Sequence, residues 1–243
     1  MIALYYHNIS NFGGAEKMIC LIANRLVKKN IEVTLITLDT LESKNYYEID
    51  SKIKWYKLGN KKNLLSKFKR IYKIYQILRK NKIKKLIGFV MSGDQTVFLS
   101  CLFASTKIIV AERNSPRMYW YKYNFYERSK VFFNLLFANR IVVQFNDYIY
   151  SYPKFLIKKI ISIPNPVSNH DCLSRVNYSN DNNEYNIICV SRLDNKQKQI
   201  SLCIEAFSKV SNITKNWKLN IIGDGKDKKL LLDKIKHFNL NNK

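Results

Sequence analysis

The stretch VSRLDNKQKQISLCIEAF, residues 190–207, predicts a strand followed by a polar turn and a helix. The apolar run 187–190 is typical of the end of a strand. After the turn, apolar residues recur at the spacing of one helix face: Ile200, Cys203, Ile204 and Phe207. A strand, a turn and a helix in this order form the repeating unit of α/β folds.

Arg192 and Lys198 lie in this turn, between the end of the strand and the start of the helix. In doubly wound sheets, ligands bind at the carboxyl ends of the strands. An arginine can hold phosphate oxygens in a fork and a lysine adds a mobile point charge, so the pair suits a diphosphate. The alternative is a solvated basic turn, because the whole chain is rich in lysine.

The rest of the chain alternates apolar runs with helical stripes, which predicts parallel βαβ units with helices on both faces of a sheet. Seven strands are expected before residue 164, at 2–6, 32–38, 53–58, 85–90, 107–111, 140–145 and 160–163. A helical stripe separates the third strand from the fourth, and we expect it to face the core: Leu64, Phe68, Ile71, Tyr75 and Leu78.

Two prolines in IPNPV, residues 163–167, end this pattern, and the polar stretch that follows indicates a linker. We therefore expect a Rossmann-like N-terminal domain over 1–167, a linker over 168–185 and the first part of a second Rossmann-like domain over 186–243. This last part holds predicted strands at 186–191 and 218–222, a helix at 200–211 and a final helix up to about residue 238. So short a sheet buries little surface, which indicates an incomplete domain.

The segment HNISNFGGAEK, residues 7–17, follows the first predicted strand. Gly13 and Gly14 would let the backbone approach a ligand closely. The helix that begins near Ala15 would offer free N–H groups and its positive dipole end to an anion. A Gly-Gly turn into a helix also occurs for purely structural reasons. Because the pattern is neither G-x-G-x-x-G nor a P-loop, it does not support a dinucleotide or Walker-type site.

Glu112 and Arg113 follow the predicted strand 107–111, at the same edge of the sheet as the Gly-Gly turn. A charged pair there suits a sugar or a phosphate, and a local ion pair is the alternative. His7 ends the first strand and is placed to line the same cleft. The spacing supports no Ser/His/Asp or Cys/His constellation.

Positive charge is concentrated in residues 51–93, which contain fourteen Lys and Arg and no Asp or Glu, in a chain of net charge +24. Six of these cations flank the apolar stripe of the 64–78 helix, as suits an anionic bilayer surface: Lys67, Lys69, Arg70, Lys73, Arg79 and Lys80. The alternatives are a solvated face and the lysine-rich composition usual for AT-rich genomes. No RRM, KH, helix-turn-helix or zinc pattern accompanies the charge, so nucleic acid is not an expected partner.

Five cysteines without a C-x-x-C pair indicate small core residues in a reducing cytoplasm and no metal site. Met1 leads at once into a strand-like IALYY, which is not a signal peptide. The apolar runs VFLSCLFA and VFFNLLFA are too short to span a membrane. We expect a cytoplasmic protein, either soluble or peripheral on the inner face of the cytoplasmic membrane.

The order of these segments resembles that of the retaining GT-B glycosyltransferases of family 4. FGGAEKMICLIANRLVKKNIEVTLIT is similar to the opening of that family. VVQFNDYIYSY, ISIPNPV and VSRLDNKQKQISLCIEAFSKV, followed by WKLNIIGDGKDKKLLLDKI, fall where the family places their counterparts. AERNSP resembles the members that build lipid-linked oligosaccharides and bacterial surface polysaccharides.

The resemblance implies transfer of a sugar, with retention at the anomeric centre, from a nucleotide-sugar to a glycan or lipid-linked acceptor. UDP is the carrier that the family's habits favour, and no metal or other cofactor is implied. Arg192 and Lys198 match the residues that bind the donor diphosphate and stabilise the leaving nucleotide, and Gly14 would close over the same phosphates. Gly13, Glu112 and Arg113 match the acceptor side, with Glu112 as the candidate catalytic residue.

One segment of the family has no counterpart in the sequence. The family carries an E-x7-E segment, downstream of the GDG helix, that binds the donor sugar and ribose, and nothing equivalent precedes Lys243. We expect a fragment of a longer enzyme, a truncated or frameshifted gene, or a fold that a second polypeptide completes. Transferase activity of this chain alone would then be weak or absent. The alternative function is a non-catalytic relic or partner subunit that retains the acceptor and membrane surface.

Overall fold

A computed structural model describes residues 1–60, 63–166, 185–211, 213 and 216–241 of the chain. The chain divides into two compact units, residues 1–168 and 169–243, and each is described by itself below. The predicted linker 168–185 lies outside the described residues except for residue 185, which begins a strand.

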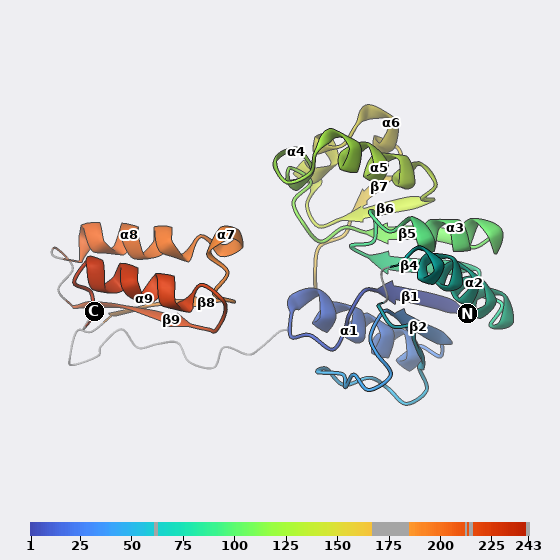
Figure 1. Ribbon diagram of the computed structural model, residues 1–243, viewed down its shortest axis with the longest axis horizontal. Coiled ribbons are helices and arrows are strands. Elements are labelled where there is room, and N and C mark those ends of the chain that lie inside the picture. Colours follow the sequence, from blue (N-terminus) through green and yellow to red (C-terminus); the bar gives the residue numbers. More distant parts are fainter. Residues whose placement is uncertain (61–62, 167–184, 212, 214–215, 242–243) are drawn as a thin grey trace. The chain divides into compact units, whose positions relative to one another are not determined.

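The first unit is built on a parallel sheet with the strand order β3-β2-β1-β4-β5-β6-β7 (Figure 1). Its strands are β1 (Ile2–Tyr6), β2 (Val33–Thr37), β3 (Lys54–Lys57), β4 (Lys85–Phe89), β5 (Lys107–Ala111), β6 (Arg140–Val143) and β7 (Ile160–Ser162). All six strand pairs are parallel. The doubly wound α/β fold predicted for this part of the chain is therefore confirmed.

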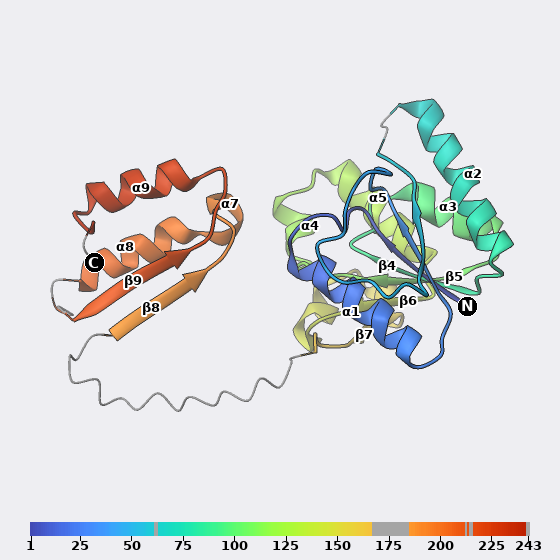
Figure 2. The ribbon, with the colours of Figure 1, turned by 90° about the horizontal axis from the view of Figure 1, so that it is seen from below.

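Helices cover both faces of this sheet. They are α1 (Gly14–Lys28), α2 (Leu64–Lys80), α3 (Gln95–Phe103), α4 (Met118–Tyr121), α5 (Phe125–Leu136) and α6 (Lys154–Ile157), with a 3₁₀ turn at Asn146–Ser151. Side chains of α2, α3 and α5 join one core cluster, and those of α1 join a second cluster on the opposite face (Figure 2).

Local sequence accounts for these elements. All five residues of β2, VTLIT, are buried, as expected of a central parallel strand covered on both faces. Polar N-caps start three of the helices: Asn63 accepts from the backbone N–H of Ser66, and Asp94 caps α3 in the same way. Asn124 forms a reciprocal capping box with Glu127 at the start of α5.

The apolar stripe of α2 is buried only in its second half, which corrects the prediction for the whole stripe. Ile74 and Leu78 lie in the core, whereas Leu64 and Phe68 are 69% and 63% exposed. In Figure 2 the helix begins away from the sheet and runs toward it. The first half of α2 therefore presents apolar and basic side chains together.

The second unit has two described parallel strands, β8 (Tyr185–Val190) and β9 (Trp217–Ile222). Its helices are α7 (Asn195–Lys198), α8 (Ile200–Val210) and α9 (Lys228–His237). The two longer helices pack on one face of the strands, as Figure 2 shows, around a core that includes Ile200, Ile204, Phe207 and Leu231. Three of these residues belong to the helical stripe that the sequence predicted.

Candidate functional site

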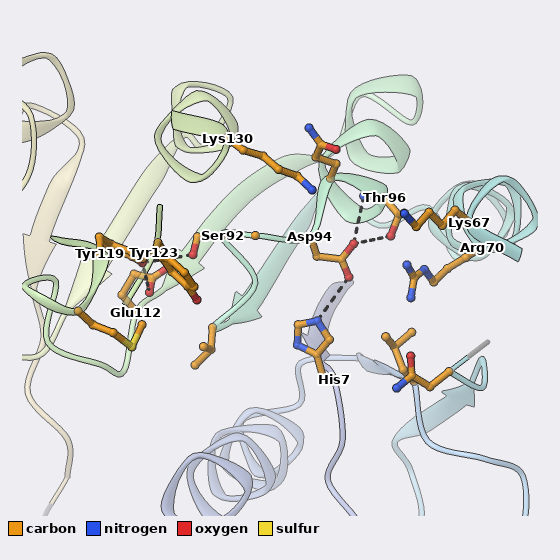
Figure 3. A pocket seen from close by; sticks show the side chains of 16 residues that line it. His7, Lys67, Arg70, Ser92, Asp94, Thr96, Glu112, Tyr119, Tyr123 and Lys130 are labelled. Atoms are coloured by element: carbon orange, nitrogen blue, oxygen red, sulfur yellow. Dashed lines mark hydrogen bonds and ion pairs between the residues drawn. The ribbon is translucent and has the colours of Figure 1, made fainter. Parts of the chain in front are cut away.

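A cavity of about 380 Å³ lies where the strand order reverses, at the carboxyl ends of β1, β4 and β5. This reversal point is where doubly wound sheets bind ligands. We call the space the switch-point cavity (Figure 3). Its lining includes ten polar or charged side chains: His7, Lys67, Arg70, Ser92, Asp94, Thr96, Glu112, Tyr119, Tyr123 and Lys130.

Asp94 is the most strongly held acid in the cavity. Its Oδ2 accepts a hydrogen bond from the Tyr5 hydroxyl at 2.7 Å and lies 3.6 Å from Nε2 of His7. Its Oδ1 accepts from the hydroxyl and the backbone N–H of Thr96 at 2.6 and 3.1 Å. Burial alone would raise the pKa of Asp94, but the interactions with His7, Thr96 and Tyr5 and the nearby charge of Arg70 hold it well below its usual range. Asp94 is therefore an ionised anchor that orients His7, which is half exposed to the cavity.

Glu112 is the second acid in the cavity, and its pKa is shifted in the opposite direction. The side chain is 4% exposed, and its Oε2 accepts a hydrogen bond from the Tyr119 hydroxyl at 2.8 Å. That hydroxyl also lies 3.2 Å from Oγ of Ser92. Burial raises the pKa of Glu112, and the hydroxyl of Tyr119 offsets this only in part. Among the described residues, Oε1 of Glu112 has no hydrogen-bond partner, so it is available to a ligand.

Arg113 leaves the cavity that its neighbour Glu112 lines. Its guanidinium lies 4.7 Å from the centre of the Phe89 ring and donates a hydrogen bond to Oδ1 of Asn165. Burial lowers the pKa of Arg113. The structure shows no ion pair between Glu112 and Arg113 in the part of the chain that it describes. Arg113 instead joins the end of β5 to the IPNPV segment.

Gly13 and Gly14 form the entry to α1 and do not line the switch-point cavity. A Cβ on Gly13 would lie within 3.0 Å of the Glu16 carboxyl group, and the carbonyl of Gly13 accepts a hydrogen bond from Tyr47 at 3.1 Å. Gly13 thus lies against the Glu16 side chain and the Tyr47 hydroxyl. A Cβ on Gly14 would meet nothing within 4 Å, so the space in front of Gly14 is open.

Arg192 and Lys198 are both exposed. Arg192 lies in the turn after β8, and Lys198 is the last residue of α7. The guanidinium of Arg192 donates a hydrogen bond to Oε1 of Gln197 at 3.2 Å. Asp194 caps α7, and its ion pair with Lys226 at 3.2 Å lowers the pKa of Asp194. In the described part of the second unit, neither Arg192 nor Lys198 has a carboxylate within 4.0 Å. Their charges are therefore available to an anion.

The GDG loop after β9 fixes the turn that carries Arg192. Gly223 has φ +155, and a Cβ there would lie on the carbonyl of Ser191. A Cβ on Gly225 would lie 2.7 Å from the carbonyl oxygen of Leu193. The backbone N–H of Leu193 donates to the carbonyl of Asp224 at 2.9 Å. Only glycines allow the two loops to pack this closely.

Sequence reasoning placed His7 near the cleft but missed Asp94, Tyr119 and Lys130. The sequence did contain a pattern that indicates Asp94. An aspartate that lies a few residues after a predicted strand and just before an apolar run is a candidate N-cap. Tyr119 and Lys130 come from α4 and α5, whose packing over β5 the spacing does not reveal.

The described residues contain no group of three or more His, Cys, Asp or Glu side chains that could hold a metal ion. Within the same residues, no helix is both long and apolar enough to cross a bilayer.

Comparison with known proteins points to glycosyltransferases. The family model described as "Glycosyl transferases group 1" matches residues 174–243. The chain is 26% identical over 240 residues to the amylovoran biosynthesis glycosyltransferase AmsD of Erwinia amylovora, covering 96% of this chain and 64% of that protein. It is 24% identical over 245 residues to a Campylobacter jejuni α-1,4-N-acetyl-D-galactosaminyltransferase, and the match covers 95% of this chain and 63% of that protein. The name of that enzyme gives GalNAc-α-(1→4)-GalNAc-α-(1→3)-diNAcBac-PP-undecaprenol as its acceptor. The chain thus spans less than two thirds of the length of these curated relatives.

A solved structure shows the same fold. The Anabaena protein HepE, crystallised with UDP and glucose, matches with a TM-score of 0.68 at 13% identity, over 99% of this chain and 67% of that one. Together with the parallel sheet, this likeness confirms the predicted α/β fold of the GT-B type, with a Rossmann-like first unit and a second unit that begins in the same way.

Proposed function

We propose that the chain is the greater part of a glycosyltransferase, which moves a sugar from a nucleotide-sugar to a glycan or lipid-linked acceptor in surface polysaccharide synthesis. The observation that carries the proposal is the pair of cations at the end of β8, Arg192 and Lys198, free of carboxylate partners among the described residues. The family match over 174–243 and the two transferase relatives support the same reaction class.

The donor site of this proposal lies on the second unit. Arg192 and Lys198 bind the two phosphates, and their charge stabilises the nucleoside diphosphate as the bond to the sugar breaks. The GDG loop holds the turn in place, so the cations are oriented before the donor binds. UDP is the carrier that the bound UDP in the HepE structure favours. We propose retention at the anomeric centre on the family 4 resemblance, and Gly14 as a contact to the donor phosphates because its surroundings are open.

The acceptor site lies in the switch-point cavity of the first unit. Oε1 of Glu112 is buried, lacks a partner among the described residues and lines the cavity, so it suits a hydrogen bond from an acceptor hydroxyl. Glu112 therefore remains the candidate catalytic residue. Arg113 and Gly13 do not line the cavity, and we keep them as candidates for the acceptor side on the family 4 resemblance alone.

The first half of α2 suits an anionic membrane surface. Leu64 and Phe68 are exposed on a helix that also carries Lys69 and Lys73 and has no acidic residue in its first turn. Apolar side chains that enter the headgroup region and lysines that contact anionic lipids act together in such helices. We propose a peripheral location on the inner face of the cytoplasmic membrane.

Thermal unfolding of the 243-residue protein with UDP-, GDP- and ADP-sugars tests the donor site. A ligand at 100 times its Kd stabilises the folded state by about 2.7 kcal/mol, so binding raises the midpoint. We expect a UDP-sugar to give the shift, and Arg192→Ala or Lys198→Ala to abolish it. Lys229→Ala, which removes an exposed lysine from α9, is the matched control and should keep the shift. No shift with any nucleotide-sugar, or a shift that Arg192→Ala leaves intact, would contradict the donor site.

A further inference from the structure

The switch-point cavity contains more positive charge than its acids neutralise. Lys67 and Arg70 reach it from α2, and Lys130 reaches it from α5 on the other side (Figure 3). Of the two acids in the lining, Asp94 is ionised but already bonded to Tyr5 and Thr96. Burial favours the neutral form of the other acid, which lies beside Tyr119 at the far end of the cavity.

These three cations lack carboxylate partners. Throughout the described residues, no carboxylate oxygen lies within 4.0 Å of the charged nitrogens of Lys67, Arg70 or Lys130. In addition, Nε of Arg70 is buried and has no hydrogen-bond partner among the residues that the structure describes. An unpaired buried donor on a charged group costs more than an ordinary lost hydrogen bond, so a ligand oxygen at this position would be favoured.

The chemistry that satisfies this arrangement is a phosphate-type anion. A guanidinium can donate two parallel hydrogen bonds to phosphate oxygens, and ammonium groups on either side add point charges. The volume of about 380 Å³ is within the range of ligand pockets and can hold a diphosphate together with part of an attached group. Leu65 and Phe68, exposed on the helix that carries Lys67 and Arg70, provide apolar surface for such a group.

We propose that Lys67, Arg70 and Lys130 bind a phosphate or diphosphate group, and that this group belongs to the acceptor, whose apolar chain lies along the first half of α2. The assignment to the acceptor rests on the proposed glycosyl transfer. The anion site itself does not, because it uses residues of the first unit alone.

Inorganic pyrophosphate is the first probe, with binding followed by calorimetric titration on the full 243-residue chain. We expect saturable binding that Arg70→Gln and Lys67→Gln each weaken about tenfold, the loss typical of one charge-assisted hydrogen bond. Arg79→Gln is the matched control, because Arg79 is exposed on the same helix but does not line the cavity. Lys67 is exposed, so its variant reports on binding even where Arg70→Gln perturbs the fold.

Two further binding measurements identify the molecule that carries the phosphate. Arg192→Ala removes any pyrophosphate held by the donor site of the second unit. In that background pyrophosphate should still bind to saturation, and Arg70→Gln should still weaken the binding, so the two proposals fail separately. Farnesyl diphosphate should bind more tightly than pyrophosphate, and Phe68→Ser should remove that advantage. Absence of pyrophosphate binding, an equal loss in Arg79→Gln, or complete loss of binding in Arg192→Ala would overturn the anion site. Weaker binding of farnesyl diphosphate than of pyrophosphate would overturn its assignment to the acceptor.

Discussion

Replacing Glu112 with glutamine should change how the stability of the first unit depends on pH. Burial raises the pKa of Glu112 in the folded state above the value of 4.5 for a free side chain. The folded state therefore favours the neutral acid. The stabilisation from Glu112 is complete below the unfolded pKa and is lost as the pH rises through the folded pKa. Glutamine keeps an acceptor oxygen for the Tyr119 hydroxyl but cannot ionise.

The magnitude follows from the linkage of a single proton. Between the unfolded and the folded pKa, the free energy of unfolding of the wild type falls by about 1.4 kcal/mol per pH unit relative to the variant. The difference in the free energy of unfolding between the two proteins starts to change near pH 4.5. It changes in favour of the variant and becomes constant above the folded pKa of Glu112. Its total change measures the pKa shift of Glu112 directly, because the other titrating groups are common to both proteins.

Urea unfolding between about pH 3.5 and about pH 9 makes the measurement, because it includes the range below the unfolded pKa. In a Trp217→Phe background, the remaining tryptophans, Trp55 and Trp120, both lie in the first unit and report on it alone. Glu42→Gln is the control, since Glu42 is exposed and its replacement should give a difference that stays flat with pH. A flat difference for Glu112→Gln as well would show that its carboxyl group titrates like an exposed one, and would refute the reasoning from burial.

Two more substitutions test the fold and the membrane surface. Gly225→Ala should destabilise the second unit by about 1–3 kcal/mol, because the new Cβ would lie 2.7 Å from the carbonyl oxygen of Leu193. Gly14→Ala should not destabilise the first unit in this way, because its new Cβ would meet nothing within 4 Å. Equal losses of unfolding free energy for the two variants in urea would contradict the close approach of the GDG loop. Phe68→Ser should change stability by no more than about 0.5 kcal/mol, whereas Ile77→Ala in the core should cost about 2–5 kcal/mol. Phe68→Ser should still reduce sedimentation with anionic vesicles, and unchanged sedimentation would argue against the membrane surface.

The central strands of the first unit were predictable from sequence because they are largely buried on both faces. A run such as VTLIT in β2 has no polar face, and the structure buries all five residues. The strand ends differ from the prediction by at most two residues, as at Leu38, whose backbone N–H donates to the carbonyl of His7 in the loop after β1.

The helix faces and the cavity were harder to predict, because both depend on how far an element extends past the sheet. Periodicity gave α2 one apolar stripe but could not show that Leu64 and Phe68 lie beyond the core. Glu112 accepts from Tyr119, seven positions later, and the hydroxyl of Tyr119 in turn lies beside that of Ser92, twenty positions before Glu112. Such pairs are set by the packing of α4 and β4, for which local spacing gives no signal.

The position of β1 in the sheet has a consequence for synthesis on the ribosome. β1 lies between β2 and β4, so both of its neighbours are made after it. Ile2 to Tyr5 pair with Lys85 to Gly88, and β2, β3 and α2 are made in between. At about 5–20 residues per second, β1 waits several seconds with one apolar edge unpaired. Nascent chains that stall before β4 therefore expose a strand edge open to pairing with other chains, and a chaperone that covers the first strand would raise the yield of folded protein.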